Sequence, residues 1–143
     1  MRPMTTVTIV ALAAGAALAQ TVLPLPKVMQ GTWTAVVPNV RTFTDTFAVT
    51  LDDPAPSGAL TGRLTLRGIG CGATDEPLTG TWDGVELRME SVVRPDINAQ
   101  RSNGQCGNGR VTFVLKRKAG QAGFEGESMR DGSTLPSQIT LGP

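Results

Sequence analysis

The chain has 143 residues, with 13 basic and 12 acidic side chains, and it contains no histidine and no tyrosine. This length suits one domain around a single core. The near-neutral charge lacks the basic patch that nucleic acids and anionic membranes require. Without histidine the chain also lacks the most common general base and metal ligand. We therefore expect a non-enzymatic protein that has no cofactor, no metal and no nucleic-acid partner.

Residues 1–19 have the features of a secretory signal peptide. Arg2 supplies a positive charge, residues 7–18 form a short apolar run, and residues 17–19 (Ala-Leu-Ala) form a small-residue cleavage site. The apolar run is shorter than the roughly 20 residues that a membrane-spanning helix needs. We expect cleavage before Gln20, export to the periplasm or the extracellular medium, and no membrane insertion of the mature chain. The excess of arginine over lysine and the abundance of alanine and glycine are typical of a GC-rich bacterial genome.

The chain has two cysteines, Cys71 and Cys106. In an exported protein of this size such a pair is typical of a structural disulfide. The chain-entropy relation assigns a bond across this loop about 4 kcal/mol of stabilisation. A redox pair is disfavoured because the C-x-x-C spacing is missing. The sequence therefore predicts one disulfide between Cys71 and Cys106.

Residues 20–30 form an extended N-terminal arm in front of the first predicted strand. Two prolines alternate with two leucines there, and each proline directs the preceding residue toward β or polyproline conformations. The arm therefore cannot be the interior of a helix. It either crosses one end of the fold or stays free for a partner. The candidate partner-binding residues of the arm are Leu23, Pro24, Leu25 and Pro26.

The rest of the chain, residues 31–143, forms one domain in which apolar and polar side chains alternate with a period of two, which predicts β-strands. The clearest example is residues 41–51, where Phe47 and Val49 share an apolar face and threonines occupy the other. Asp45 falls on the apolar face and is the exception. No window has the 3.6-residue period of an amphipathic helix. The predicted strands cover residues 31–37, 41–51, 59–67, 77–82 and 85–93, and a last strand ends at Leu141. Between them lie two more predicted strands, with inward-facing Val111, Phe113 and Leu115 on one and Phe124, Gly126 and Ser128 on the other.

An Asp-Gly pair at residues 83–84 separates two of these strands and is a strong signal for a β-hairpin. Gly84 supplies the positive φ that a type I′ turn needs. We expect the strands to pair across this two-residue turn. On the second strand, Val85 and Leu87 are expected to face the core. Trp82, at the end of the first strand, should lie on the same inner face as Leu87.

About eight short strands that follow one another through turns favour an antiparallel up-and-down topology. With one apolar face each, they close into a small all-β barrel, which also leaves no exposed edge. A two-sheet β-sandwich is the alternative fold. Gly62, Gly80 and Gly126 fall on the inward register, where glycine suits a sharp bend or close approach by a neighbour such as Trp33.

The inward-facing positions point to binding more than to catalysis. The candidate lumen residues combine two aromatic rings with two opposite charges. One interpretation is that they line a partly polar cup for a small ligand. The other is that the tryptophans fill the ends of the barrel and that the polar groups lie near strand ends, where they reach solvent. The candidate lumen residues are Trp33, Asp45, Trp82 and Arg117.

Residues 31–33 (Gly-Thr-Trp) form the G-x-W pattern that opens the lipocalins and avidins, and residues 58–62 and 78–83 resemble later strands of the streptavidin type. The chain is thus similar to the calycin-type secreted barrels. The resemblance implies an exported binding module for a small apolar or mixed ligand. The biotin-site residues of avidins are not matched at the corresponding positions, which hold Ala35, Leu64 and Leu66.

The chain also resembles secreted bacterial barrels that inhibit metalloproteases. The shared features are a signal peptide, a Gly-x-Trp start, one disulfide and an N-terminal arm that enters the protease cleft. This resemblance implies an alternative function. The protein would then be a protein-binding protease inhibitor that acts through residues 20–30, with a secreted protease as its partner.

Overall fold

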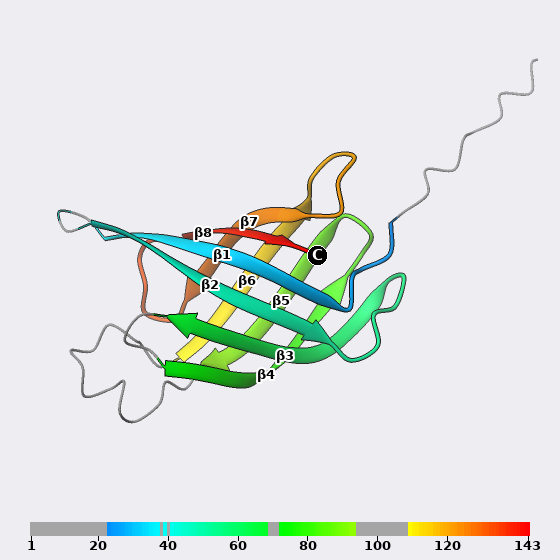
Figure 1. The fold of residues 1–143 in the computed structure, drawn as a ribbon, viewed down its shortest axis with the longest axis horizontal. Helices are drawn as coiled ribbons and strands as arrows, with labels where there is room; N and C mark the ends of the chain where they lie inside the picture. Colours follow the sequence, from blue (N-terminus) through cyan, green and yellow to red (C-terminus); the bar gives the residue numbers. More distant parts are fainter. Residues whose placement is uncertain (1–22, 38, 40, 69–71, 94–108) are drawn as a thin grey trace, which may run out of the picture.

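The computed structural model describes residues 23–37, 39, 41–68, 72–93 and 109–143. Within these ranges the chain forms eight strands and no helix (Figure 1). Each strand pairs antiparallel with the next one in the sequence. The strands are β1 (Val28–Val37), β2 (Arg41–Leu51), β3 (Gly58–Gly68), β4 (Gly72–Trp82), β5 (Glu86–Val93), β6 (Gly109–Arg117), β7 (Phe124–Arg130) and β8 (Ser137–Gly142).

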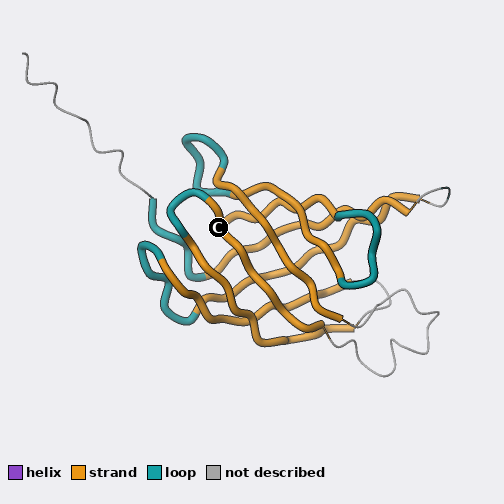
Figure 2. The backbone as a smooth tube through the Cα atoms, turned by 180° about the vertical axis from the view of Figure 1, so that it is seen from behind, coloured by secondary structure: helices purple, strands orange, loops and turns teal. Residues whose placement is uncertain are grey.

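The barrel closes between its first and last strands. β8 lies antiparallel to β1, with Trp33 opposite Ile139, and the eight strands form a closed ring in sequence order (Figure 2). The predicted up-and-down barrel is confirmed, and the alternative two-sheet sandwich is wrong. Among the described residues, no helix has the length and apolarity needed to cross a membrane.

The interior is filled with apolar side chains, because a ring of eight strands is just wide enough for side chains to fill it. Phe47 on β2 and Phe113 on β6, four strands away around the ring, stack with their ring centroids 5.7 Å apart. Opposite walls therefore meet through their side chains. The buried apolar residues are Leu25, Met29, Phe47, Val49, Leu51, Leu60, Leu64, Leu66, Leu78, Trp82, Leu87, Met89, Val93, Val111, Phe113, Leu115, Phe124, Ile139 and Leu141.

Inward glycines let neighbouring strands approach closely. A Cβ atom at Gly62, Gly80 or Gly126 would lie 2.1 to 2.2 Å from a carbonyl oxygen of the paired strand. A Cβ atom at Gly31 would meet β8 in the same way, at 2.2 Å. The close neighbour of these glycines is the backbone of the paired strand. The predicted approach by a neighbouring side chain such as Trp33 is therefore wrong.

β4 begins ahead of its predicted start, because it pairs with β3 along its whole length. Its pairing with β5, by contrast, stops at Leu78 opposite Ser91. The preceding residue of β4, Pro77, has no N–H to donate, and prolines in sheets are confined to places where no ladder bond is needed. In the described part of the chain, residues 72–77 therefore have a partner strand on one side only.

The β4–β5 hairpin turns one residue later than predicted. The backbone N–H of Asp83 donates to the carbonyl of Glu86 at 3.4 Å, so Gly84 and Val85 are the two central residues. Gly84 has φ 94°, and positive φ at the first central position is typical of a type II′ turn rather than type I′. Val85 is 65% exposed, so its predicted place in the core is wrong.

Asp83 caps this turn with its side chain. Its Oδ1 accepts hydrogen bonds from the backbone N–H groups of Glu86 at 2.7 Å and Val85 at 2.8 Å. These N–H groups, that of Glu86 first, lower the pKa of the Asp83 carboxyl because they stabilise its charged form. Trp82 on β4 and Leu87 on β5 are paired at the turn end of the hairpin and are both buried, which confirms their predicted inner position.

Cys71 and Cys106 lie outside the described residues, so the disulfide between them stays a prediction. Residues 1–22 also lie outside them. These residues hold the predicted signal peptide and the start of the arm.

Candidate functional site

The barrel has two ends of different character. At the arm end, residues 23–27 lie beside the turns that join β2 to β3, β4 to β5 and β6 to β7 (Figure 1). At the opposite end, called the distal end here, β1, β3, β5 and β7 end and β2, β4, β6 and β8 begin. The predicted lumen residues are divided between these ends. Trp82 and Arg117 lie at the arm end, whereas Trp33 and Asp45 lie toward the distal end.

The arm packs onto the barrel. Leu25 is 4% exposed and belongs to the hydrophobic core. The carbonyl of Lys27 accepts a hydrogen bond from the backbone N–H of Leu51 at 2.8 Å, and β1 already begins at the next residue, Val28. The arm is therefore shorter than predicted and covers this end of the barrel. The predicted arm residues that stay accessible are half-buried Pro26 and exposed Leu23 and Pro24.

Arg117 fastens the arm to the barrel. Its guanidinium lies 4.9 Å from the ring centroid of Phe124 and 5.2 Å from that of Trp82. Its Nη1 donates to the carbonyl of Leu23, and its Nη2 donates to the carbonyl of Pro24 at 3.2 Å. Burial lowers the pKa of Arg117. One side chain thus joins two aromatic rings of the barrel to two main-chain acceptors of the arm.

Trp82 closes the arm end from within the barrel. It is 1% exposed and meets Phe124 edge to face, with the ring centroids 5.6 Å apart. Trp82 Nε1 and Arg117 Nε are buried and have no hydrogen-bond partner among the described residues. For this pair the structure favours the second interpretation of the sequence. Trp82 and Arg117, together with Leu25, fill the arm end and do not line a cup.

A second cluster lies on the inner wall toward the distal end. Trp33 packs against the hydrophobic core and stays partly accessible. Asp45 is its partner on β2 and is also half-buried. The guanidinium of Arg130, at the end of β7, lies over the Trp33 ring at 5.6 Å from its centroid, and burial lowers the pKa of Arg130. An aromatic face, a cation and a carboxylate thus share one part of the wall.

Arg130 is the residue of this cluster that sequence analysis missed. The predicted inward-facing residues of this strand were Phe124, Gly126 and Ser128, and they did not go on to Arg130, the last residue of β7. Phe124 and Ser128 are buried and Arg130 is half-buried, so the alternation continues to the end of the strand. One further step of the period of two would have placed Arg130 on the inner face.

The inner wall around this cluster is more polar than the middle of the barrel. The hydroxyl of Ser91 donates a hydrogen bond to the carbonyl of Pro77 at 2.8 Å. Ser128, also buried, lies opposite half-buried Ser137. Glu76 follows the inward register of β4 and is half-buried. Polar groups therefore collect at the end that the arm does not cover.

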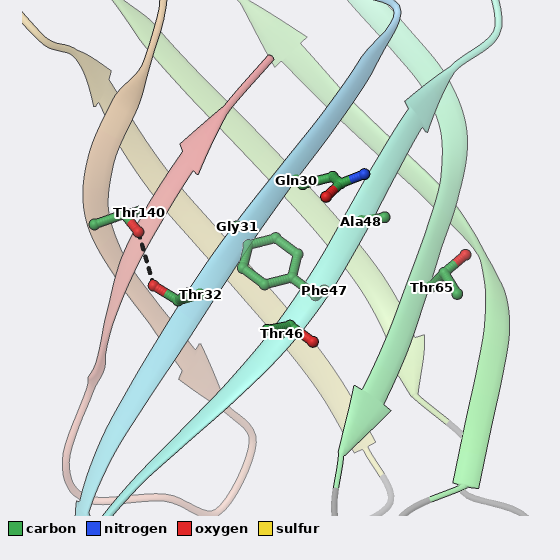
Figure 3. A pocket seen from close by; sticks show the side chains of 8 residues that line it. All are labelled: Gln30, Gly31, Thr32, Thr46, Phe47, Ala48, Thr65 and Thr140. Atoms are coloured by element: carbon green, nitrogen blue, oxygen red, sulfur yellow. Dashed lines mark hydrogen bonds between the residues drawn. The ribbon is translucent and has the colours of Figure 1, made fainter.

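A surface depression of about 560 Å³ lies on the outer wall over β8, β1, β2 and β3 (Figure 3). Thr32 and Thr140 join across two of these strands with their hydroxyl oxygens 2.8 Å apart. The buried Phe47 ring lies behind Gly31, so the depression touches the core at this residue. It contains none of the predicted site residues. Its lining residues are Gln30, Gly31, Thr32, Thr46, Phe47, Ala48, Thr65 and Thr140.

Among the described residues, no group of three or more histidine, cysteine, aspartate or glutamate side chains is placed to hold a metal ion. The charged groups of the distal cluster are the guanidinium of Arg130, which lies over the Trp33 ring, and the carboxylate of Asp45, the strand partner of Trp33. Such an arrangement can bind a ligand through stacking and charge.

Comparisons of this chain with protein-family models, with curated proteins and with solved structures each find no match. The class of the protein is therefore defined by its fold. It is a closed, eight-stranded, antiparallel β-barrel that is compatible with a calycin-like fold.

Proposed function

We propose that this chain is an exported, non-enzymatic barrel of the lipocalin and avidin type that binds a small apolar or mixed ligand. The up-and-down topology supports this proposal, because such barrels bind ligands at their mouths. The arm covers one end of the barrel. Its Leu25 is buried in the core, and Arg117 of β6 binds its backbone carbonyls. The distal end is therefore where we place the ligand.

The observation that carries the proposal is the cluster at the distal end. Trp33 is partly accessible although it lies on the inner wall, with Arg130 over its ring and Asp45 opposite it on β2. Ligand sites combine an apolar or aromatic surface with a few polar groups that orient the ligand. The contact between Phe47 and Phe113 fills the barrel further in. The ligand is therefore expected to lie near the distal end and to be small.

The proposal is tested with N-phenyl-1-naphthylamine, a neutral aromatic probe whose fluorescence rises in apolar sites. In a Trp82→Phe variant, Trp33 is the sole tryptophan, and the chain has no tyrosine. We expect the probe to accept energy from Trp33 in this variant. Trp33→Ala should weaken probe binding about tenfold, because a stacking surface is lost. Probe binding that is the same in Trp33→Ala and in the Trp82→Phe control would overturn the proposal.

Native mass spectrometry of the protein purified from its own host complements this test. A bound mass that is present in the Trp82→Phe variant and absent from Trp33→Ala would identify the natural ligand.

We do not extend the proposal to protease inhibition through the arm. Leu25 is buried in the barrel, and Arg117 and Leu51 hold the backbone of the arm in place. Entry of the described arm residues 23–27 into a protease cleft would require these contacts to break first.

A further inference from the structure

Each end of the barrel places an arginine over a tryptophan, but the two arginines use their hydrogen-bond donors differently. Arg117, over Trp82, donates to two carbonyls of the arm. Arg130, over Trp33, makes no hydrogen bond through its side chain and no ion pair with any described residue. Among the described residues, the hydrogen-bond donors of the stacked arginine thus find partners at the arm end and find none at the distal end.

The Arg130 guanidinium is a half-buried cation without a counter-charge in the described structure. Two half-buried carboxylates fall on the inward register of their strands toward this end, Asp45 on β2 and Glu76 on β4. Neither comes within ion-pair distance of Arg130. A guanidinium offers five N–H donors in a planar fork that matches a carboxylate or a similar anion.

We propose that the distal site recognises ligands that carry one carboxylate or a comparable small anionic group, which Arg130 binds while the apolar part of the ligand lies on Trp33. This inference rests on the proposed function and names its ligand class. Hydrogen bonds between a guanidinium and an anion are about twice as strong as those between neutral groups. An anion therefore accepts hydrogen bonds from the guanidinium of Arg130 more strongly than a neutral carbonyl does.

Asp45 gives the bound ligand a direction. It lies beside Trp33 on β2, whereas Arg130 reaches the ring from β7. An anionic group close to Asp45 would be repelled and one at Arg130 would be attracted. The ligand is therefore oriented with its anionic group on the β7 side and its uncharged part toward β2.

The test compares two probes that differ by one anionic group. 1-Anilinonaphthalene-8-sulfonate has the skeleton of N-phenyl-1-naphthylamine with a sulfonate added. We expect the wild-type protein to bind the sulfonate about tenfold more tightly than the neutral probe, because one charge-assisted interaction is gained. High salt should remove most of this preference, since it screens the charge. Equal affinity for the two probes would overturn the inference and leave the proposed function standing.

Two variants locate the effect. Arg130→Gln should lose the preference for the sulfonate and keep its affinity for the neutral probe. Arg110→Gln is the control, because Arg110 is exposed on the outer wall of β6 and pairs with Glu90. A sulfonate preference that survives in Arg130→Gln would overturn the inference. Should Arg130→Gln fail to fold, Arg130→Lys keeps the charge without the planar fork, and an undiminished preference there would overturn the role of the fork. Failure of both probes to bind would overturn the proposed function together with this inference.

Discussion

At the scale of single residues, glycines set how closely the strands of this barrel approach one another. A Cβ atom at Gly126 would lie 2.1 Å from the carbonyl oxygen of Val114, and one at Gly142 would meet nothing within 4 Å. We expect Gly126→Ala to lower the free energy of unfolding by about 1–3 kcal/mol, because the paired strand must shift. Gly142→Ala should stay within about 0.5 kcal/mol of wild type. Urea denaturation followed by tryptophan fluorescence measures both, and equal effects would contradict this account.

At this scale the sequence could predict whether a side chain faces the inside or the outside of the barrel. It could not predict how far that side chain lies from either end of the barrel. The alternation of apolar and polar residues placed Trp33, Asp45 and Trp82 on the inner face, and all three have restricted exposure there. The same alternation cannot tell that Trp82 meets the arm while Trp33 stays accessible. That difference depends on where the arm crosses the ring and on Arg117, which is distant in sequence from both tryptophans.

At the scale of single elements, the β4–β5 turn depends on a charged cap. The folded-state pKa of Asp83 is lowered by the backbone N–H groups of Glu86 and Val85. The stabilisation is therefore present above the pKa of an unfolded aspartate and is lost as the pH falls through the lower folded value. We expect Asp83→Ala to be less stable than wild type at pH 7 and to approach it in acid, once the pH has fallen below the lowered folded-state pKa of Asp83.

The midpoints of urea denaturation at pH 7 and in acid measure this effect. The control is Asp83→Asn, which keeps an acceptor oxygen without a titratable group. Its stability relative to Asp83→Ala should not change with pH. A gap between wild type and Asp83→Ala that persists in acid would show that the charge of the cap is not responsible.

The arm is a second element, and two of its leucines, one buried and one exposed, can be compared to measure its contribution to stability. Leu25 is 4% exposed, whereas Leu23 is 45% exposed. We expect Leu25→Ala to cost about 2–5 kcal/mol, because it leaves a cavity in the core, and Leu23→Ala to cost much less. In a Trp33→Phe background, Trp82 alone reports on this end. Its emission should shift to longer wavelength in Leu25→Ala and stay unchanged in Leu23→Ala, and a reversed order would refute the buried arm.

At the scale of the whole molecule, the closed barrel could be predicted because closure follows from a repeated local pattern. Short strands, short turns and one apolar face per strand leave few other antiparallel arrangements. The register of the β4–β5 hairpin could not be predicted from the Asp-Gly pair, because the Asp83 side chain replaces a backbone acceptor and moves the turn to Gly84 and Val85. The early start of β4 was missed because it depends on pairing with β3 and not on its own alternation.

The predicted bond between Cys71 and Cys106 concerns the molecule as a whole, because it would link the connections on either side of β4 and β5. We expect the mass of the mature protein to be two hydrogens below that of the reduced chain. Reduction should lower the free energy of unfolding by about 4 kcal/mol. Two free thiols detected in the folded protein after export would show that the bond does not form.

The interrupted ladder between β4 and β5 has a consequence for the dynamics of the barrel wall. Residues 72–77 are paired with β3 alone in the described part of the chain. Alternate amides of an antiparallel strand point to opposite neighbours, so every second amide of this segment has no strand acceptor among the described residues. Hydrogen–deuterium exchange should therefore be fast at alternate positions there and slow throughout β6, which pairs on both sides. The wall is expected to open first along this seam, next to the distal end.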